Sequence, residues 1–322
     1  MKFLFLRGRV PQDRDPSQIM FDNINDCDDV WTQLAYHISS RGYGEIWYWD
    51  GKRKVTYSPN FIERWIPKFN IKKYDFKPDV IFTRGGFKEY DIILRRNPQA
   101  FKIYYGAGKR FYPQSNFTKY NLILNDTAKQ VKKTSSLFPN SRVELLLKPS
   151  ADNVFKPAQV TKKIYDVIMV ANENPKRDIK GHHFSTLNVP KEMNFIKVGI
   201  SLKSTRKKNK HIKFINLVPR KDLPKLYAQS KVAIVCCNNV DSAPRVLIEA
   251  IACNCPILVL DNVNFWHKKY INSHTGEICS KSDFANRLEY MVDNYERYEP
   301  YKYYKEELSL VCASKRINSF IH

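Results

Sequence analysis

Short apolar runs, separated by longer stretches of helical pattern, recur along the whole chain. In the first half, the runs that predict strands are residues 2–6, 45–49, 79–83, 102–105 and 122–125. In the second half they are residues 165–170, 193–198, 212–217, 232–237 and 257–260. Helical patterns lie between or after them, at residues 30–40, 221–230, 245–252, 283–294 and 302–321. Short strands that alternate with helices predict an α/β fold built on parallel sheets.

The segment 145–157, LLLKPSADNVFKP, divides this pattern into two halves. It places two prolines and several polar residues between two sheet-forming regions, which is typical of a hinge between domains. A chain of 322 residues has room for two domains of about 150 residues each. We therefore predict one domain over residues 1–150, a second over 151–300, and a helical segment at 301–322.

The stretch from 231 to 262, KVAIVCCNNVDSAPRVLIEAIACNCPILVLDN, is the most informative part of the sequence. Residues 232–237 and 257–260 are continuous apolar runs, as expected of strands buried on both faces. Between them, Pro244 fits the first position of a helix, and residues 245–252 carry helix formers with an apolar stripe. The stretch therefore predicts a strand, a loop, a helix and a second strand in a βαβ crossover.

Two carboxylates accompany the start of this predicted helix. Asp241 lies in the loop before it, and Glu249 lies one or two turns into it. A helix N-terminus at the carboxyl end of a parallel strand offers free N–H groups and the positive end of the helix dipole to an anion. A pyrophosphate on those amides, with carboxylates beside it for sugar hydroxyls, describes a nucleotide-sugar site. The alternative is an ordinary buried βαβ unit in which Glu249 is a solvated helix acid.

The same stretch resembles the signature of the family 4 (group 1) retaining glycosyltransferases, which have the GT-B fold. That signature has two acidic residues separated by seven others, then the run EAMA, a glycine and PVV. Here Asp241 and Glu249 have this separation, Glu249 opens EAIA, and Pro256 opens PIL. The chain departs from the pattern in three places, because Asp241 stands where Glu is usual and Ser242 and Asn254 replace glycines.

Other segments extend the resemblance, which covers residues 145–295 well and the first domain in outline. The hinge segment resembles the family's interdomain segment, and residues 221–230 resemble the helix before its signature strand. The loop after strand 165–170 carries Lys180 followed by a glycine, and Arg177. These match the cations with which the family holds the donor pyrophosphate, and Lys176 is an alternative to Arg177.

The resemblance implies two Rossmann-like domains facing a central cleft, with a C-terminal helix that crosses back to the first domain. It implies that Glu249 holds the ribose hydroxyls and that Asp241 contacts the transferred sugar. Lys180 and Arg177 would stabilise the charge that develops on the leaving diphosphate. The further donor-side residues that we expect are Lys176, Ser242, Ala243, Pro244 and Gly8. On the acceptor side, the glycine-rich basic turn after strand 102–105 supplies Gly106, Gly108, Lys109 and Arg110.

We expect no metal and no cofactor besides the nucleoside diphosphate sugar, which is a co-substrate. Cys253 and Cys255 are closely spaced, but no second Cys/His pair has metal-ligand spacing. The seven cysteines are odd in number, and several lie in predicted core elements, as in a reducing compartment. No run approaches the roughly 18 apolar residues of a transmembrane helix. The expected location is cytoplasmic, or peripheral on the inner membrane face.

The net charge of +22 is unusually high. Residues 1–150 and residues 151–322 each carry an excess of +11, so the charge belongs to both predicted domains. It suggests a polyanionic partner, which would be an anionic membrane, an acidic glycan or DNA. Residues 201–213 concentrate six cations with no acid, of which we expect these to contact the partner: Arg206, Lys207, Lys208 and Lys210. The alternative is that the positive charge reflects only a composition rich in Lys and Asn, with no anionic partner.

The sequence thus predicts a retaining, hexosyltransferase-like enzyme that moves a sugar from a nucleoside diphosphate sugar to a hydroxyl. The expected acceptor is an envelope glycan or its lipid carrier. Two other classes stay open. A DNA-modifying glycosyltransferase that acts on hydroxylated bases would also explain the charge. A non-catalytic GT-B protein that binds a nucleotide or glycan would agree with Asp241 in place of Glu.

Overall fold

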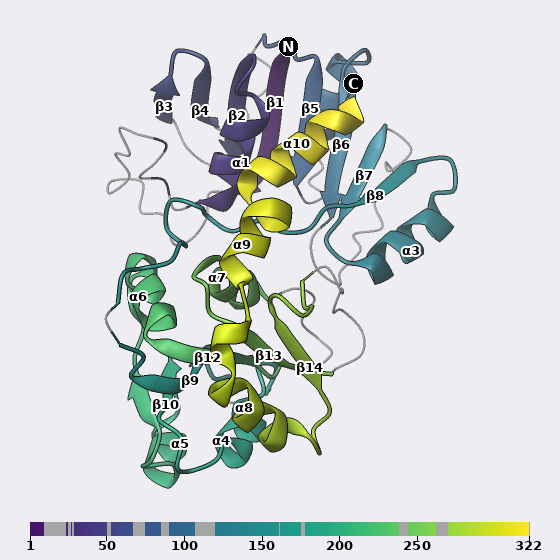
Figure 1. Cartoon of the computed structure of the whole chain (residues 1–322). Coiled ribbons are helices and arrows are strands. Elements are labelled where there is room, and N and C mark those ends of the chain that lie inside the picture. The colour runs from purple at the N-terminus through teal and green to yellow at the C-terminus, as the bar shows by residue number, and fades with distance from the viewer. Residues whose placement is uncertain are drawn as a thin grey trace. The chain divides into compact units, whose positions relative to one another are not determined.

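The computed structural model describes residues 1–9, 24, 27, 29–49, 53–66, 75–84, 90–106, 120–160, 162–174, 178–237, 244–261 and 270–321 (Figure 1). The chain divides into two compact units. Unit 1 contains Met1–Leu147 and Ala313–His322, and unit 2 contains Lys148–Cys312. The division falls inside the hinge segment 145–157.

A single sheet forms the centre of unit 1. Its strands are β1 (Lys2–Arg9), β2 (Tyr43–Trp49), β3 (Arg53–Ser58), β4 (Phe61–Ile66), β5 (Val80–Arg84), β6 (Phe101–Gly106), β7 (Leu122–Asn125) and β8 (Arg142–Leu145). They lie in the order β3-β4-β2-β1-β5-β6-β7-β8. Apart from β3, which pairs antiparallel with β4 at one edge, these strands are parallel to their neighbours. The predicted parallel sheet is therefore correct except for this hairpin, which the sequence pattern did not indicate.

The helices of unit 1 include α1 (Val30–Ile38), α2 (Tyr90–Arg96) and α3 (Ala128–Leu137). Side chains before two of them accept hydrogen bonds from first-turn amides, since Asp29 caps α1 and Thr127 caps α3. Such caps satisfy backbone donors that have no partner within the helix. On the sheet, Leu4, Leu6 and Ile81 are buried in one apolar cluster that also contains side chains of α2.

The C-terminal residues return to unit 1, as the family resemblance implied. Residues 313–321 of α10 (Leu310–Ile321) belong to that unit. There the Asn318 side-chain amide donates a hydrogen bond to the Ile38 carbonyl oxygen at 3.4 Å. The Arg142 guanidinium also lies over the ring of Phe320, 4.8 Å from its centre.

The single helix predicted over residues 302–321 is interrupted. After α9 (Pro300–Tyr303) the chain makes a π-helical turn (Tyr304–Leu308) and becomes extended at Ser309. Asp152 fixes the break, because its carboxylate accepts hydrogen bonds from the Tyr304 hydroxyl and from the Leu310 backbone N–H. This contact joins residues more than 150 positions apart, so no local pattern could have predicted it.

Unit 2 has a second parallel sheet. Its strands are β9 (Tyr165–Val170), β10 (Phe195–Val198), β11 (Lys213–Ile215), β12 (Ser230–Val235), β13 (Ile257–Leu260) and β14 (Gly276–Cys279), in the order β11-β10-β9-β12-β13-β14. Its helices include α4 (His182–Asn188), α5 (Lys203–Lys208), α6 (Leu223–Ala228), α7 (Arg245–Ala252) and α8 (Phe284–Asp293). The strand order runs outward from β9 to β11 and then restarts at β12 on the other side of β9. This reversal is the topological switch point of a Rossmann-like sheet, at which ligands usually bind.

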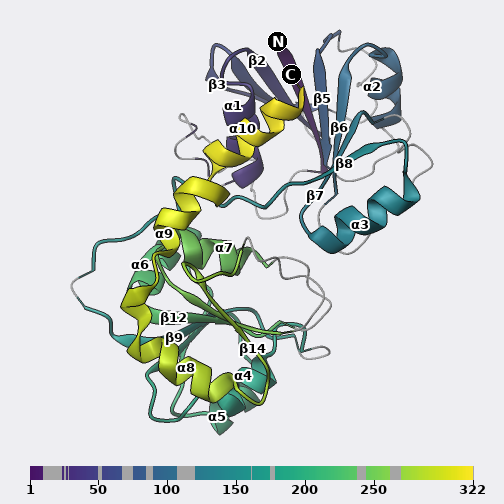
Figure 2. The same ribbon diagram turned by 45° about the vertical axis from the view of Figure 1, so that its right-hand side comes forward.

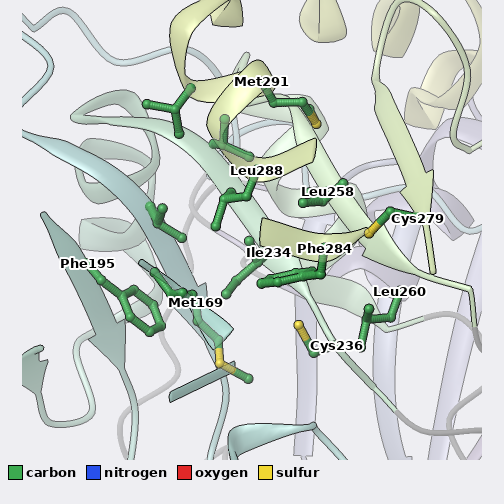
Figure 3. Close-up of a cluster of buried hydrophobic side chains, with 14 of the residues drawn as sticks. Met169, Phe195, Ile234, Cys236, Leu258, Leu260, Cys279, Phe284, Leu288 and Met291 are labelled. Atoms are coloured by element: carbon green, nitrogen blue, oxygen red, sulfur yellow. The ribbon is translucent and has the colours of Figure 1, made fainter. Parts of the chain in front are cut away.

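An apolar cluster under α8 holds this sheet in place (Figure 3). Phe284, Leu288 and Met291 of the helix pack on side chains of the strands, among them Met169 and Ile234. All five are buried, which agrees with strands that are covered on both faces. Among the described residues, no helix is both long enough and apolar enough to cross a bilayer.

The βαβ crossover predicted at 231–262 is formed by β12, α7 and β13. Pro244 is the N-cap of α7 in an extended conformation, and not the first helical residue as predicted. At the other end, Asn254 has a left-handed backbone with φ of 58°. Asn tolerates this conformation better than most residues, which explains how it occupies the signature's glycine position.

Candidate active site

A pocket of about 430 Å³ lies at the switch point of the unit 2 sheet. It is lined by residues that follow β9 and β10, by the segment before α6, and by the first two turns of α7. We call it the switch-point pocket. Three of the residues singled out in the sequence lie in it together: Lys180, Pro244 and Glu249.

Helix α7 carries Glu249 into this pocket. The apolar face of the helix buries Leu247, Ile248 and Ile251 against unit 2, which fixes the direction of the remaining side chains. Glu249 is only 6% exposed, so it is not a solvated helix acid. Burial raises the pKa of its carboxyl group, while the charges of Arg220 and Arg245 act in the opposite direction.

Arg220 is the partner of this carboxylate. Its guanidinium donates a hydrogen bond to Glu249 at 3.2 Å, and it lies over the buried ring of Phe155 at 5.2 Å from the ring centre. An ion pair supported in this way holds the carboxylate in one orientation. Arg220 was not predicted from the sequence, because an arginine between a strand and a helix has no local signature. Its position after β11, at the carboxyl edge of the sheet, was the only available signal.

The N-terminus of α7 opens into the same pocket, since Arg245 and Val246 are among its lining residues. Its N-cap, Pro244, has no side-chain acceptor for the amides of the first turn. Helix α4 differs, because the carboxylate of Asp178 accepts hydrogen bonds from the His182 and His183 amides. The start of α4 thus already has a carboxylate on its amides, whereas the described residues at the start of α7 supply none.

Gly181 explains the lysine-glycine pair of the loop before α4. Its φ is 72°, and a Cβ at this position would collide with the carbonyl oxygen of Cys236 at the end of β12. Glycine therefore allows the loop to approach the sheet closely and to bring Lys180 to the pocket.

A second glycine, Gly199, lines the pocket and was not predicted from the sequence. Gly199 follows β10 with φ of 118°, and a Cβ there would lie 2.5 Å from the carbonyl oxygen of Ala171. A side chain at Gly199 would be strained and would narrow the pocket. A glycine directly after a predicted strand was the signal that could have found it.

Two buried bases lie in this part of unit 2. Lys197 of β10 is 0% exposed, and its ammonium group donates a hydrogen bond to Ser201 and lies over the ring of Phe214. Burial lowers the pKa of Lys197 to about 8. Burial and, secondarily, the charge of Lys197 lower the pKa of His182. The sequence indicated neither residue. A lysine within an apolar run, such as Lys197, resembles a residue of an exposed edge strand.

The remaining predicted residues divide into two groups. Gly8 and Gly106 lie at the carboxyl ends of β1 and β6 in unit 1, and the pairing of β1 with β2 shifts register at Gly8. The others lie outside the described residues: Lys176, Arg177, Asp241, Ser242, Ala243, Gly108, Lys109 and Arg110. In the part of the chain that the structure describes, no group of three or more His, Cys, Asp or Glu side chains is arranged to hold a metal.

Solved structures that match this chain include glycosyltransferases of the GT-B fold. Sucrose-phosphate synthase from Thermosynechococcus elongatus is 11% identical, with a TM-score of 0.69, and the match covers 99% of this chain and 98% of that one. HepE from Anabaena, in complex with UDP, is 12% identical with a TM-score of 0.70, and 100% and 99% are covered. A glycosyltransferase from Rickettsia africae is 14% identical with a TM-score of 0.70, and 99% and 98% are covered. The chain has the GT-B fold that the sequence predicted.

The resemblance to group 1 glycosyltransferases is confirmed over part of unit 2. Residues 199–308 match the model of the glycosyl transferases group 1. The matched segment contains Arg220, α7 and Glu249, so it includes much of the switch-point pocket. Among curated proteins, none shows significant similarity to the chain.

Proposed function

We propose that the protein is a retaining glycosyltransferase whose donor, a nucleoside diphosphate sugar, binds in the switch-point pocket. The observation that carries this proposal is the convergence of the Glu249 carboxylate, the α7 N-terminus and Lys180 on one pocket of unit 2. A carboxylate suits ribose hydroxyls, and amides beside a cation suit a pyrophosphate. A metal site would not need the helix amides and the lysine, and a site for a carboxylate substrate would not need the Glu249 carboxylate.

In the proposed reaction, the bond between the anomeric carbon and the diphosphate oxygen breaks, and a bond from that carbon to the acceptor oxygen forms. The acceptor proton passes to the leaving phosphate on the same face, which retains the anomeric configuration. Lys180 and the α7 amides stabilise the negative charge that grows on the diphosphate. Arg177, or Lys176, adds a second cation, and Asp241 contacts the transferred sugar. Ser242, Ala243 and Gly8 complete the donor side. No metal enters this scheme, so a chelator is expected to leave turnover unchanged.

The domain covering residues 1–150 is proposed to receive the acceptor, with Gly106, Gly108, Lys109 and Arg110 facing it. The domain at 151–300 holds the donor. The basic excess of both domains supports a polyanionic acceptor, such as an acidic envelope glycan or its lipid carrier. The protein would then act in the cytoplasm or at the inner membrane face.

A thermal-shift panel of nucleoside diphosphate sugars tests the donor. A bound ligand stabilises the folded state by about 2.7 kcal/mol at one hundred times its dissociation constant, so the correct donor raises the melting temperature. HepE is known in complexes with UDP and with UDP-glucose, which makes uridine sugars the first to test. If no nucleoside diphosphate sugar shifts the melting temperature, the donor assignment is wrong.

A second experiment separates an enzyme from a non-catalytic binder. An enzyme of this class releases nucleoside diphosphate slowly even without acceptor, whereas a binder leaves the donor intact. The basic excess also supports a DNA-modifying glycosyltransferase as a second candidate. Sugar transfer to duplex DNA with hydroxylated bases, but not to glycan acceptors, would favour that alternative.

A further inference from the structure

Helices α4 and α5 lie at the same end of unit 2 (Figures 1 and 2). They contribute residues to a second pocket, of about 750 Å³. We call it the α4–α5 pocket. It shares no lining residue with the switch-point pocket. Its basic lining residues come from α4, α5 and the segments after them: His183, Lys191, Lys207, Lys208, Lys210 and His211.

The lining of this pocket holds four lysines and one carboxylate. Among the described residues, Lys191, Lys207, Lys208 and Lys210 make no hydrogen bond or ion pair through their ammonium groups. The carboxylate of Glu173 also lines the pocket and offsets one of the four lysine charges, which leaves the lining with a basic excess. It accepts hydrogen bonds from the Leu202 backbone N–H at 2.8 Å and from the Thr205 hydroxyl at 2.7 Å, at the start of α5.

The helix dipole accounts for only part of this arrangement. Lys207 and Lys208 lie in the last turn of α5, where cations are favoured by about 0.3–1 kcal/mol each. Lys191 lies beyond the end of α4, and Lys210 lies beyond the end of α5, so neither position is explained in this way. Four like charges around one pocket repel one another, and a bound anion would remove that repulsion.

The structure also divides the charge run at 201–213. Arg206 donates a hydrogen bond to the Asn216 side chain and lies over the Phe214 ring at 5.7 Å, and it does not line the pocket. It therefore serves the fold of unit 2. The three lysines that follow Arg206 line the pocket with Lys191, which is distant in the sequence. The basic surface is thus a cluster assembled by the fold.

We propose that the α4–α5 pocket binds a compact anionic group with several phosphates or carboxylates, carried by a glycan chain or a lipid headgroup. This inference rests on the proposed function, since it gives unit 2 a binding site for an anionic group of the acceptor, whose reacting hydroxyl is received by the first domain. A pocket of this volume has the size of ordinary small-ligand sites, so the anionic group enters it. A DNA duplex presents its phosphates along a rod and would instead use a flat or extended basic surface.

The test compares two variants that lose the same charge. The pocket variant is K191Q/K207Q/K208Q/K210Q. The control variant is K156Q/K162Q/K221Q/K225Q, which changes exposed lysines of unit 2 outside the pocket. Binding is measured at low salt with a short heparin fragment, for the glycan source, and with phosphatidylglycerol vesicles, for the lipid source. Binding of duplex DNA is measured in parallel, as the comparison.

We expect the pocket variant to lose at least about tenfold in affinity for one of the two probes, because charge-assisted bonds to the anion are removed. The control variant should change by less than about twofold, since its four lysines do not line the pocket. The probe that is lost identifies the source of the anion. Equal losses in both variants, no loss in either, or a selective loss of duplex DNA binding alone would overturn the proposal.

Two further measurements keep the test decisive. If the pocket variant does not fold, the single variant Lys191→Glu, which changes an exposed residue outside α4 and α5, should weaken the same probe. Thermal shifts by the nucleoside diphosphate sugar should be equal in wild type and the pocket variant. Failure of wild type to bind any such sugar would remove the proposed function while leaving the result for the anion pocket intact.

Discussion

The switch-point pocket and the α4–α5 pocket lie in the same unit, but their charges are arranged differently. In the first, the Glu249 carboxylate is buried and held by Arg220, which packs on Phe155. In the second, exposed lysines surround a space whose only described carboxylate, Glu173, is engaged in starting α5. The first pocket thus contains a carboxylate paired with an arginine, and the second contains an excess of lysines over carboxylates.

The difference predicts two kinds of recognition. Burying a charged pair costs desolvation free energy. In return, the neighbouring groups hold both partners of the pair in a fixed geometry. Exposed lysines lose little solvation free energy, but their side chains have no fixed geometry. Salt screens their charges beyond about 8 Å at physiological ionic strength. Ligand binding in the switch-point pocket should therefore depend on shape and respond weakly to salt. Binding in the α4–α5 pocket should weaken steeply as salt rises.

The largest expected effect is on turnover. We predict that Lys180→Ala lowers kcat by about 100-fold or more, because a cation near the leaving diphosphate matters most in the transition state. Donor affinity should fall by a much smaller factor. The measurement is kcat against the dissociation constant of the donor sugar. Lys180→Ala should weaken the binding of nucleoside diphosphate but not the binding of bare nucleoside. Equal weakening of both would contradict this role.

The next effect is on donor binding. We predict that Glu249→Ala weakens the binding of the donor by about 1.5–3 kcal/mol, which is typical of the loss of a hydrogen bond to a charged group. The conservative variant Glu249→Gln keeps the side-chain shape, and circular dichroism controls for folding in both. Unchanged donor affinity in both variants would remove Glu249 from the site.

The same residue predicts a pH dependence. Burial raises the pKa of Glu249 above its ordinary value of 4.5, so its carboxylate becomes protonated at a higher pH than an exposed glutamate. A protonated carboxyl group accepts hydrogen bonds poorly, and donor affinity should decline as the pH falls through this raised pKa. Titration calorimetry across acidic pH should show the decline in wild type and a flat profile in Glu249→Gln.

A buried cation sharpens the contrast with the exposed lysines. The pKa of Lys197 is about 8 in the folded protein, below the ordinary 10.5, so the folded state binds fewer protons between these values. Wild-type stability should therefore rise with pH through this window, and the penalty for the buried charge is fully present below pH 8. We predict that Lys197→Met stabilises the protein by about 2 kcal/mol at pH 7. The gain should disappear above pH 10.5, and Lys203→Met, an exposed control, should show neither effect.

The smallest effect concerns Arg220. Replacing it with lysine keeps the charge but loses the planar group that lies over Phe155, so donor affinity should fall by about three- to fivefold. The double variant with Glu249→Gln should be less than additive, because the two side chains act as a pair. Strict additivity in a double-mutant cycle would show that Arg220 does not position Glu249.

Much of this architecture could be predicted from the sequence, because buried parallel strands such as β12 and β13 are continuous apolar runs. The hairpin of β3 and β4 was missed, since its mixed polar and aromatic pattern does not resemble a buried strand. Glu249 and Lys180 were found through the family pattern. Arg220 and Lys191 were not, because each joins its site only through contacts that the fold makes between distant segments.

The return of the C-terminal helix to unit 1 affects how the chain acquires its structure during synthesis. Asn318 and Ile38 are in contact although 280 positions separate them, and all of unit 2 is encoded between them. Unit 1 therefore begins to emerge from the ribosome first but is completed last, after unit 2 has been translated. Until then, the surface that α10 will cover around α1 and β8 stays open on the nascent chain, where it can recruit chaperones or associate wrongly.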